Sequence, residues 1–457
     1  MIGVKDNVFE KEAVGKLLLK FSIPSIVSLL IAELYNMVDT IFVGREVGGE
    51  AIAALVVVFP IQRFVVAFSM MMAIGASTAV ARSNGEKDSD NARRIIMNSM
   101  SLIFTIMIPT IVLTSIFKTN IVKVFGASDR IIPYAEDYLA IIIFGSIFQC
   151  LSTTMNYIMM ALGDRKVALK STFIGAIGNI IIDAILIIGF SYGVKGAGIG
   201  TVVSQGFAFL YSFYHFKNIK EQFNLSYGFK FDWERWKSIL SVGFSAFIVE
   251  AEDGIVLVIL NNLLLLNAGD EGVIILGVIS KLSMFLFITI MGISSAMQPI
   301  AAYNLGAKNY KKLKEVVKKT AIYALITSTV LWGISMVFAK QLISVFIKDV
   351  DIIAKSAKAY RTMIAVFPLI SIYYMSIYYF QALGMAKSSF IVSIFRQLII
   401  LLPVSVILMS VFNLGALGAW LSYPISDLVS SVTSFILMKK QTKKIDIKIK
   451  DTALEAA

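Results

Sequence analysis

The stretch "GNIIIDAILIIG", Gly178–Gly189, places one ionisable residue, Asp183, in the middle of an apolar run. A charged side chain at the centre of a membrane-spanning helix costs about 2.5–3.5 kcal/mol on insertion scales. Where such residues occur, they face the interior of a helix bundle or a water-filled cavity. The stretch therefore predicts a transmembrane helix with a buried polar site inside it.

The composition of the whole chain is that of a polytopic membrane protein. Its 457 residues are 57% hydrophobic and 16% charged, with a mean hydropathy of +0.79. Soluble domains are about 45–50% apolar and about 25% charged. A single cysteine and a single histidine leave little basis for disulfides, zinc, haem or histidine-based catalysis, so we expect no cofactor.

Two further classes are disfavoured. The net charge of +12 is spread over short connections between apolar segments, so we expect no nucleic-acid binding. The sequence has no nucleotide-binding GxxxxGK[ST] motif and no nucleophile–base pair with supporting context. We therefore do not expect an enzyme.

Twelve segments are long enough to span a bilayer as a helix, which takes about 20 mostly apolar residues. The first begins near Leu17 and is too long for the core of a signal peptide. The sequence thus predicts an all-α polytopic membrane protein with 12 transmembrane helices: 17–43, 51–80, 95–117, 133–161, 170–190, 196–215, 239–266, 273–303, 320–344, 356–383, 389–412 and 415–438.

Lysine and arginine are concentrated at both termini and in the even-numbered connections. By the positive-inside rule, both termini are expected on the cytoplasmic side. The basic stretch "KKQTKKIDIKIK", 439–450, has two interpretations. It could bind acidic lipid headgroups, but we favour a topology anchor and a solvated tail.

The chain resembles itself at an offset of 221 residues, where "ALGDRK" (161–166) aligns with "ALGMAK" (382–387). "NGEK" (84–87) aligns with "LGAK" (305–308) at the same offset. Six spans before and six after a connection give two six-helix lobes related by a parallel internal repeat. The expected organisation is an N-terminus (1–16), an N-lobe (17–215), a linker (216–238), a C-lobe (239–438) and a basic tail (439–457).

Polar and small residues form one face of the fifth segment, at the spacing of a helix: Thr172, Gly175, Ala176, Asn179 and Asp183. The isoleucines of this segment mostly occupy the other faces. The first segment repeats the pattern with Glu33, Asn36 and Asp39, each three residues apart. The sixth segment adds Thr201 beside glycines that permit close helix packing.

These residues predict a hydrated pocket in the N-lobe, with Asp39 and Asp183 as its acids and Asn179 and Thr201 as neutral oxygen ligands. Two close carboxylates cannot both stay ionised cheaply, so they can bind a proton or a hard cation such as Na⁺. The structural alternative is a hydrogen-bonded pair, or an acid neutralised by Arg63.

The seventh segment contains Glu250, Glu252 and Asp253, which could draw lipophilic cations into a substrate path. They could equally lie at a helix end or pair with Lys281. Glu33 could belong to the same path or pair locally. The methionine- and tyrosine-rich stretches 69–75 and 371–384 suit planar cations, but helix packing is the favoured explanation for most of these residues.

With these motifs in view, the chain resembles the MATE family of multidrug and toxic-compound extruders, in a MepA-like bacterial branch. The resemblance covers residues 17–438. It rests on "NMVDTIFVG" (36–44), "ALGDRK" (161–166), "GNIIIDAILI" (178–187), "GVKGAGIGTVVSQ" (193–205) and "YNLGAKNYKKLKE" (303–315).

The resemblance implies export of organic cations by alternating access, in antiport with H⁺ or Na⁺. It also implies a monomer in the bacterial cytoplasmic (inner) membrane. Asp39, Asn179, Asp183 and Thr201 stand at positions matching an N-lobe ion site in similar proteins. Another branch uses acids of helices 7 and 10, but Ser356–Leu383 contains no acid, which makes that arrangement doubtful here.

Two other functions stay open. One is a lipid-linked saccharide flippase of related architecture, which would need cationic residues such as Arg63, Arg361 and Arg396 for its pyrophosphate. The other is a channel, which would conduct passively without saturable exchange. Acids in the first, fifth and seventh segments favour the exporter.

Overall fold

A computed structural model describes residues 8–47, 49–226, 228–346 and 349–455. Their side chains are described except at 35–41, 44–45, 49–50, 52, 270, 448 and 450–455. The chain divides into two compact units, each built of long helices. Unit 1 contains α1 (Val8–Lys11) and Val27–Glu250, and unit 2 contains Glu12–Ile26 and the described residues from Ala251 onward.

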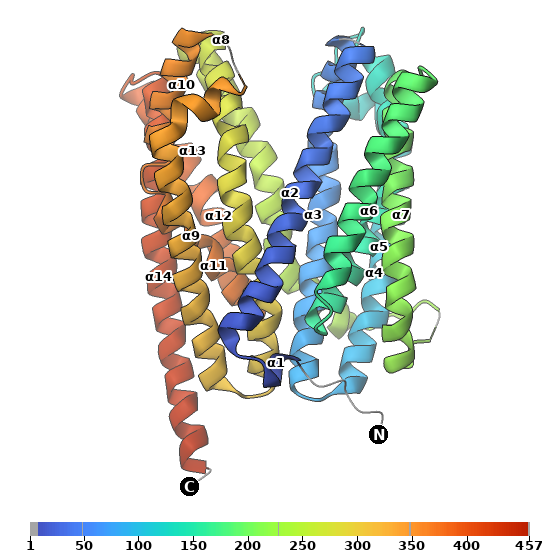
Figure 1. Ribbon diagram of the computed structural model, residues 1–457, viewed down its shortest axis with the longest axis vertical. Helices are drawn as coiled ribbons and strands as arrows, with labels where there is room; N and C mark the ends of the chain where they lie inside the picture. Colours follow the sequence, from blue (N-terminus) through green and yellow to red (C-terminus); the bar gives the residue numbers. More distant parts are fainter. Residues whose placement is uncertain (1–7, 48, 227, 347–348, 456–457) are drawn as a thin grey trace. The chain divides into compact units, whose positions relative to one another are not determined.

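Unit 1 is organised around α5 (Ile132–Ala161), which packs against α3, α4, α6 and α7. Figure 1 shows α6 and α7 running side by side within this unit. The other helices are α2 (Val14–Glu46), α3 (Gly49–Gly85), α4 (Ser89–Val124), α6 (Lys166–Asp183), the π-helix η1 (Ala184–Gly189) and α7 (Gly193–Gln222).

Besides Glu12–Ile26, unit 2 contains α8 (Trp233–Gly306) from Ala251 onward, and α8 is interrupted at Gly269 by a backbone with φ 64° and ψ −164°. Pro368 lies in the first turn of α11, after a 54° bend from α10. The elements are α9 (Tyr310–Ser344), α10 (Val350–Met363), α11 (Phe367–Ala382), α12 (Ala386–Ile394), η2 (Phe395–Leu401), α13 (Leu402–Val406), η3 (Ile407–Val411) and α14 (Ala416–Glu455).

The predicted all-helical fold with twelve long segments is confirmed. The interruption at Gly269 divides α8 into two segments, whereas α10 with α11 forms one segment, and the run from α12 to η3 forms another. In the described chain, nine helices are long and apolar enough to cross a membrane, and ten when the bent α10–α11 pair is counted. α7 and the part of α8 before Gly269 are not among these spans.

The internal repeat extends to the backbone. Lys87 and Lys308, 221 residues apart, both adopt a left-handed conformation with φ of 60° and 54°. Each follows a helix and precedes an N-cap, where Asp88 and Asn309 accept hydrogen bonds from the backbone N–H three residues later. These side chains satisfy N–H groups that have no partner within the helix. The turns predicted from the aligned "NGEK" and "LGAK" motifs therefore have the same construction.

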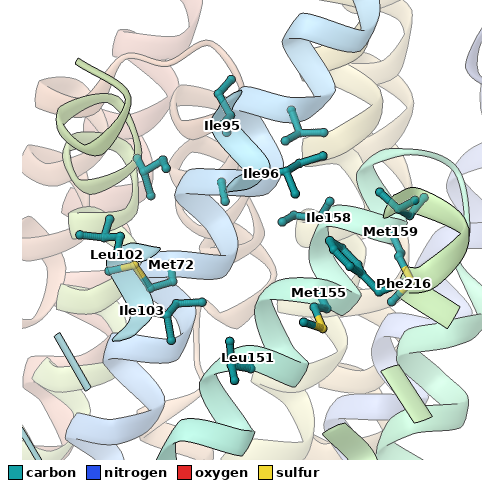
Figure 2. Close-up of a cluster of buried hydrophobic side chains, with 14 of the residues drawn as sticks. Met72, Ile95, Ile96, Leu102, Ile103, Leu151, Met155, Ile158, Met159 and Phe216 are labelled. Atoms are coloured by element: carbon teal, nitrogen blue, oxygen red, sulfur yellow. The ribbon is translucent and has the colours of Figure 1, made fainter. Parts of the chain in front are cut away.

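The core of unit 1 is a cluster of aliphatic and sulfur-containing side chains between α3, α4, α5 and α7. Figure 2 shows Ile96, Met72 and Ile158 among its members, with Phe216 of α7 closing one side. Met72 is 1% exposed and Ile158 is fully buried. Conversely, many isoleucines and phenylalanines on the outer helix faces are exposed, as expected of surfaces that meet lipid.

Candidate functional site

Asp183 is the last residue of α6 and directly precedes the π-helix η1. Its side chain is fully buried, and Asn179, one turn earlier, is 1% exposed. Ile177 and Ile181, on other faces of the helix, are 41% and 53% exposed. The helical spacing therefore turns the polar stripe inward, as predicted. A π-helical turn beside it is notable because such turns often occur at functional sites.

The inward face of α6 packs tightly on α7. A Cβ atom added at Gly200 of α7 would overlap Oδ1 of Asp183. Gly175 of α6 would meet Ala208 of α7 at 3.3 Å in the same way. Small residues at such contacts let helix backbones approach closely. The packing brings Asp183 against the turn of α7 that carries Thr201, which is 5% exposed.

The neutral members of this group have unused hydrogen-bonding capacity. Neither the side-chain amide of Asn179 nor the hydroxyl of Thr201 has a hydrogen-bond partner within the described part of the chain. Buried polar atoms without partners are rare and call for an explanation such as a bound water or ion. We call Asn179, Asp183 and Thr201 the Asp183 cluster. Its carboxylate, amide and hydroxyl oxygens are donors suited to a proton or a hard cation.

A cavity of about 80 Å³ adjoins the cluster, and Thr201 forms part of its wall. Its lining is both apolar and polar and includes three glutamines, of which Gln205 donates to Oε1 of Gln149 at 3.1 Å. Gln62 donates to the hydroxyl of Tyr138, also at 3.1 Å. A space of this size with polar groups in its wall has room for water molecules beside Thr201.

Arg63 also lines this cavity and lies between two acids. Its guanidinium is 3.7 Å from Glu33 of α2 and 3.9 Å from Glu250 of α8. The sequence left open whether Arg63 neutralises Asp39 or Asp183. Among the residues whose side chains are described, its ion pairs are with the two glutamates, and its relation to Asp39 stays untested. For Glu33 the sequence allowed a place in the substrate path or a local ion pair, and the structure shows an ion pair with Arg63.

Two predicted site residues, Asn36 and Asp39, belong to α2, but their side chains lie outside the described part. Their assignment to an ion site or a substrate path stays a prediction.

Unit 2 contains a separate buried polar group centred on Arg396 of η2 and Asp427 of α14. The guanidinium Nε donates to Oδ1 of Asp427 at 2.7 Å, and the two residues are 4% and 2% exposed. The guanidinium also lies over the rings of Phe287 and Tyr373, at 5.3 and 5.8 Å. Arg396 is thus a partner between helices, since it joins η2 to α14.

Two acids of α8 lie beside this group, the buried Glu252 and the exposed Asp253. Gln397 donates from its amide nitrogen to Oε1 of Glu252 at 3.1 Å and to Oδ1 of Asp253 at 2.6 Å. Glu252 is 2% exposed. The sequence had offered Lys281 as a partner, but the hydrogen bonds of these acids come from Gln397. We call Glu252, Asp253, Arg396, Gln397 and Asp427 the Arg396 network.

Sequence reasoning missed Gln397 and Asp427. The signal for Asp427 was present, because it is a single acid in the apolar and serine-rich run "SYPISDLVSSV", just as Asp183 is in its own. Gln397 carried no such signal, since a neutral amide in a spanning helix is common. Its role depends on a contact with residues 144 and 145 positions away.

The methionine- and tyrosine-rich stretches serve packing in the structure. Met72 is 1% exposed, and Tyr373 and Tyr379 are 1% and 0% exposed. Arg361 of α10 donates to the backbone carbonyl of Met336 in α9 at 2.8 Å. The burial of Met72, Tyr373 and Tyr379 agrees with helix packing, which was the favoured explanation for the methionine- and tyrosine-rich stretches.

Comparison with known proteins gives relatives along almost the whole chain. The Multidrug export protein MepA of Staphylococcus haemolyticus is 26% identical over 410 residues, covering 89% of both chains. MepA of Staphylococcus aureus strain NCTC 8325 is 25% identical over 407 residues, covering 89% of this chain and 90% of the relative.

Solved structures share the fold. A crystal structure of MATE in complex with MaD3S matches with a TM-score of 0.90 at 23% identity, covering 98% of this chain and 99% of that one. A MOP-superfamily transporter from Pyrococcus furiosus matches with the same score, identity and coverage. The MatE family model matches residues 24–185 and 255–407, well over half of the chain. The protein is thus a multi-pass membrane protein that belongs to the MatE family.

Proposed function

We propose that this protein is a secondary active multidrug efflux transporter that exports organic cations and other amphiphiles by alternating access, in antiport with H⁺ or Na⁺. Membership of the MatE family and relatives named multidrug export protein support the proposal. The observation that carries it is the Asp183 cluster, a fully buried acid beside an amide and a hydroxyl with unused hydrogen-bonding capacity.

In the proposed mechanism, the ion is loaded at Asp183. An ionised carboxylate is costly at membrane depth, and a proton or Na⁺ removes its net charge. Asn179 and Thr201 supply the further oxygens that a cation needs, and the cavity beside Thr201 supplies a hydrated approach. Ion loading shifts the conformational equilibrium toward the state that binds the ion more tightly. The free energy of this shift cannot exceed the difference between the ion's binding free energies in the two states. Asp39 would complete the site as its second acid.

The substrate path is proposed to use acids of α2 and α8. Glu33 and Glu250 flank Arg63, and Glu252 and Asp253 belong to the Arg396 network. Acidic side chains attract organic cations. In the absence of substrate, Arg63 and Gln397 bind these acids, and an arriving cation would compete with them for the carboxylates. Asn36 is included from its position on the same helix as Glu33.

The proposed setting is the bacterial cytoplasmic membrane, with both termini cytoplasmic and the protein acting as a monomer. The predicted lobes, 17–215 and 239–438, would be the two moving bodies of the transport cycle.

Transport in proteoliposomes tests the proposal. Wild-type protein should move ethidium against its gradient when ΔpH or a Na⁺ gradient is imposed, and the gradient that works identifies the coupling ion. Asp183→Asn should insert normally but lose this coupled movement. The matched control is Asp137→Asn, an exposed acid of α5 that pairs with Lys195 at 3.3 Å and should transport normally. Coupled transport by Asp183→Asn at the wild-type rate would refute the assignment.

The flippase alternative gains no support from the arginines. Arg63 is bound to two glutamates, Arg361 to backbone carbonyls and Arg396 to Asp427. A pyrophosphate would have to displace these partners. Binding of a lipid pyrophosphate in preference to ethidium would reverse the ranking.

A further inference from the structure

The basic segment after the last predicted span is a continuation of α14, which extends to Glu455. Its buried stripe also continues: Met438 is 6% exposed and Ile445, well inside the basic segment, is 4% exposed. A solvated tail would leave Ile445 in water. The segment expected to be a solvated tail is therefore packed against unit 2 at least as far as Ile445.

The outward face of α14 changes character along its length. Phe435 and Ile436 are 54% and 59% exposed, as expected of a lipid-facing surface. One turn later the same face carries Lys439, followed by Lys443, and both are exposed. The lysines thus lie where the apolar band ends, at the level expected for lipid headgroups.

The first turns of α9 show the same transition. Lys318 is exposed, and Ile322 and Ile326, one and two turns further along, are 43% and 57% exposed. Figure 1 shows α9 and α14 side by side in unit 2. An ion pair between Lys314 and Asp446, at 2.6 Å, fixes their register at this end.

This register brings lysines of the two helices together. With a rise of about 1.5 Å per residue, Lys318 lies about 6 Å beyond Lys314 on α9. Lys443 and Lys439 lie about 4.5 and 10 Å before Asp446 on α14 by the same measure. All three share helix faces with the residues of the Lys314–Asp446 pair, because they are three, four or seven residues from them. The register therefore places three lysine residues within one short stretch of the two helices.

Three acids near this end, all with described side chains, are already paired. Asp446 binds Lys314, Glu315 binds Lys319 at 2.7 Å, and Glu12 binds Lys20. By contrast, six exposed lysines in this region form no ion pair with any described residue: Lys311, Lys318, Lys439, Lys440, Lys443 and Lys444. Like charges on adjacent faces repel, and an anion between them would relieve the repulsion.

We propose that Lys318, Lys439 and Lys443 form a binding site for the phosphate group of an anionic phospholipid. A lipid fits better than a soluble anion because Ile322, Ile326, Phe435 and Ile436 offer an exposed apolar surface for its acyl chains directly beside the lysines. The site goes beyond the proposed efflux function and does not depend on it.

Thermal unfolding of the full-length protein in neutral detergent tests the site. Phosphatidylglycerol should raise the unfolding temperature in a saturable, salt-sensitive manner, and phosphatidylcholine should not. The triple variant Lys318→Gln, Lys439→Gln, Lys443→Gln should need about tenfold more phosphatidylglycerol for half-maximal effect, since each lysine near an anionic lipid surface contributes to binding. The corresponding triple Arg variant should respond like wild type.

A matched control removes three exposed lysines from unit 1: Lys217→Gln, Lys230→Gln and Lys237→Gln. It loses the same charge and should respond to phosphatidylglycerol like wild type. An unchanged response of the α9–α14 variant would overturn the proposal, as would equal losses in the two triple Gln variants. Inorganic phosphate at matched ionic strength should give no stabilisation, and an effect equal to that of the lipid would also overturn it.

Discussion

The Asp183 cluster and the Arg396 network each contain a buried acid and each adjoin a π-helix, yet they are built from different partners. In unit 1 the acid lies near a neutral amide and a neutral hydroxyl, whose polar atoms have no hydrogen-bond partner within the described residues. In unit 2 the acid Asp427 is held by an arginine at 2.7 Å. The first arrangement can accept a cation, whereas the second already contains one.

The internal repeat makes this difference informative. The two units share turn positions and N-caps 221 residues apart. At that offset, the counterpart of Asp183 is Val404, and the counterpart of Asp427 is Gly206. The same helical plan therefore carries its charges at different positions in the two halves. We infer that unit 1 specialises in ion loading and that the Arg396 network mainly organises unit 2.

The largest contrast is expected in stability. Asp427→Asn leaves Arg396 as a buried charge without its carboxylate and should destabilise the protein by about 3–5 kcal/mol. Asp183→Asn should leave stability close to the wild-type value, because the amide keeps the shape of the carboxylate and carries no charge to be buried. Unfolding in detergent, followed by circular dichroism, measures both. Equal destabilisation by the two variants would break the comparison.

Close packing in unit 1 gives the next effect. Gly200→Ala places a Cβ atom where Oδ1 of Asp183 lies, and overpacking of this kind costs about 1–3 kcal/mol. Gradient-driven ethidium transport should fall strongly, because the acid is displaced. Gly206→Ala, on the same helix, meets nothing within 4 Å and is the matched control. Similar transport by the two variants would show that Asp183 need not pack on Gly200.

A smaller effect is expected from Gln397→Leu in unit 2. The change removes the donor that bridges Glu252 and Asp253, and a buried group left without its hydrogen bond costs about 1–3 kcal/mol. The unfolding temperature should drop, while the ion dependence of transport should keep its wild-type midpoint. A shifted midpoint would indicate that the Arg396 network contributes to ion binding, and would contradict its assignment to a structural role.

The smallest effect concerns Thr201. Thr201→Val removes the hydroxyl with little change in shape, and losing one such interaction of about 1.4 kcal/mol weakens apparent ion affinity about tenfold. Thr201→Ser keeps the hydroxyl and should stay near wild type. Transport rates measured over a range of pH and Na⁺ concentrations give both midpoints. Identical midpoints for the Val and Ser variants would exclude the hydroxyl as a ligand.

Much of the N-terminal site could be predicted because its signal is local. Asn179 and Asp183 are one helical turn apart, so their shared face follows from the helix period. The Arg396 network could not be predicted in the same way. Arg396 meets Asp427 across 31 residues, and Gln397 meets Glu252 across 145. Nothing in the local pattern specifies which of several polar residues in separate helices will come into contact.

The sequence alone determined the membrane class, the twelve long helical segments and the internal repeat, because apolar length and helix period are properties of short stretches. Only the tertiary structure decided the neighbours: Asp183 packed on Gly200, Arg63 between two glutamates, and α14 fixed to α9 through Lys314 and Asp446. The reason is that helices distant in the sequence pack through the complementary shapes of entire helix faces. The identity of one residue therefore does not specify which residue of another helix it will contact.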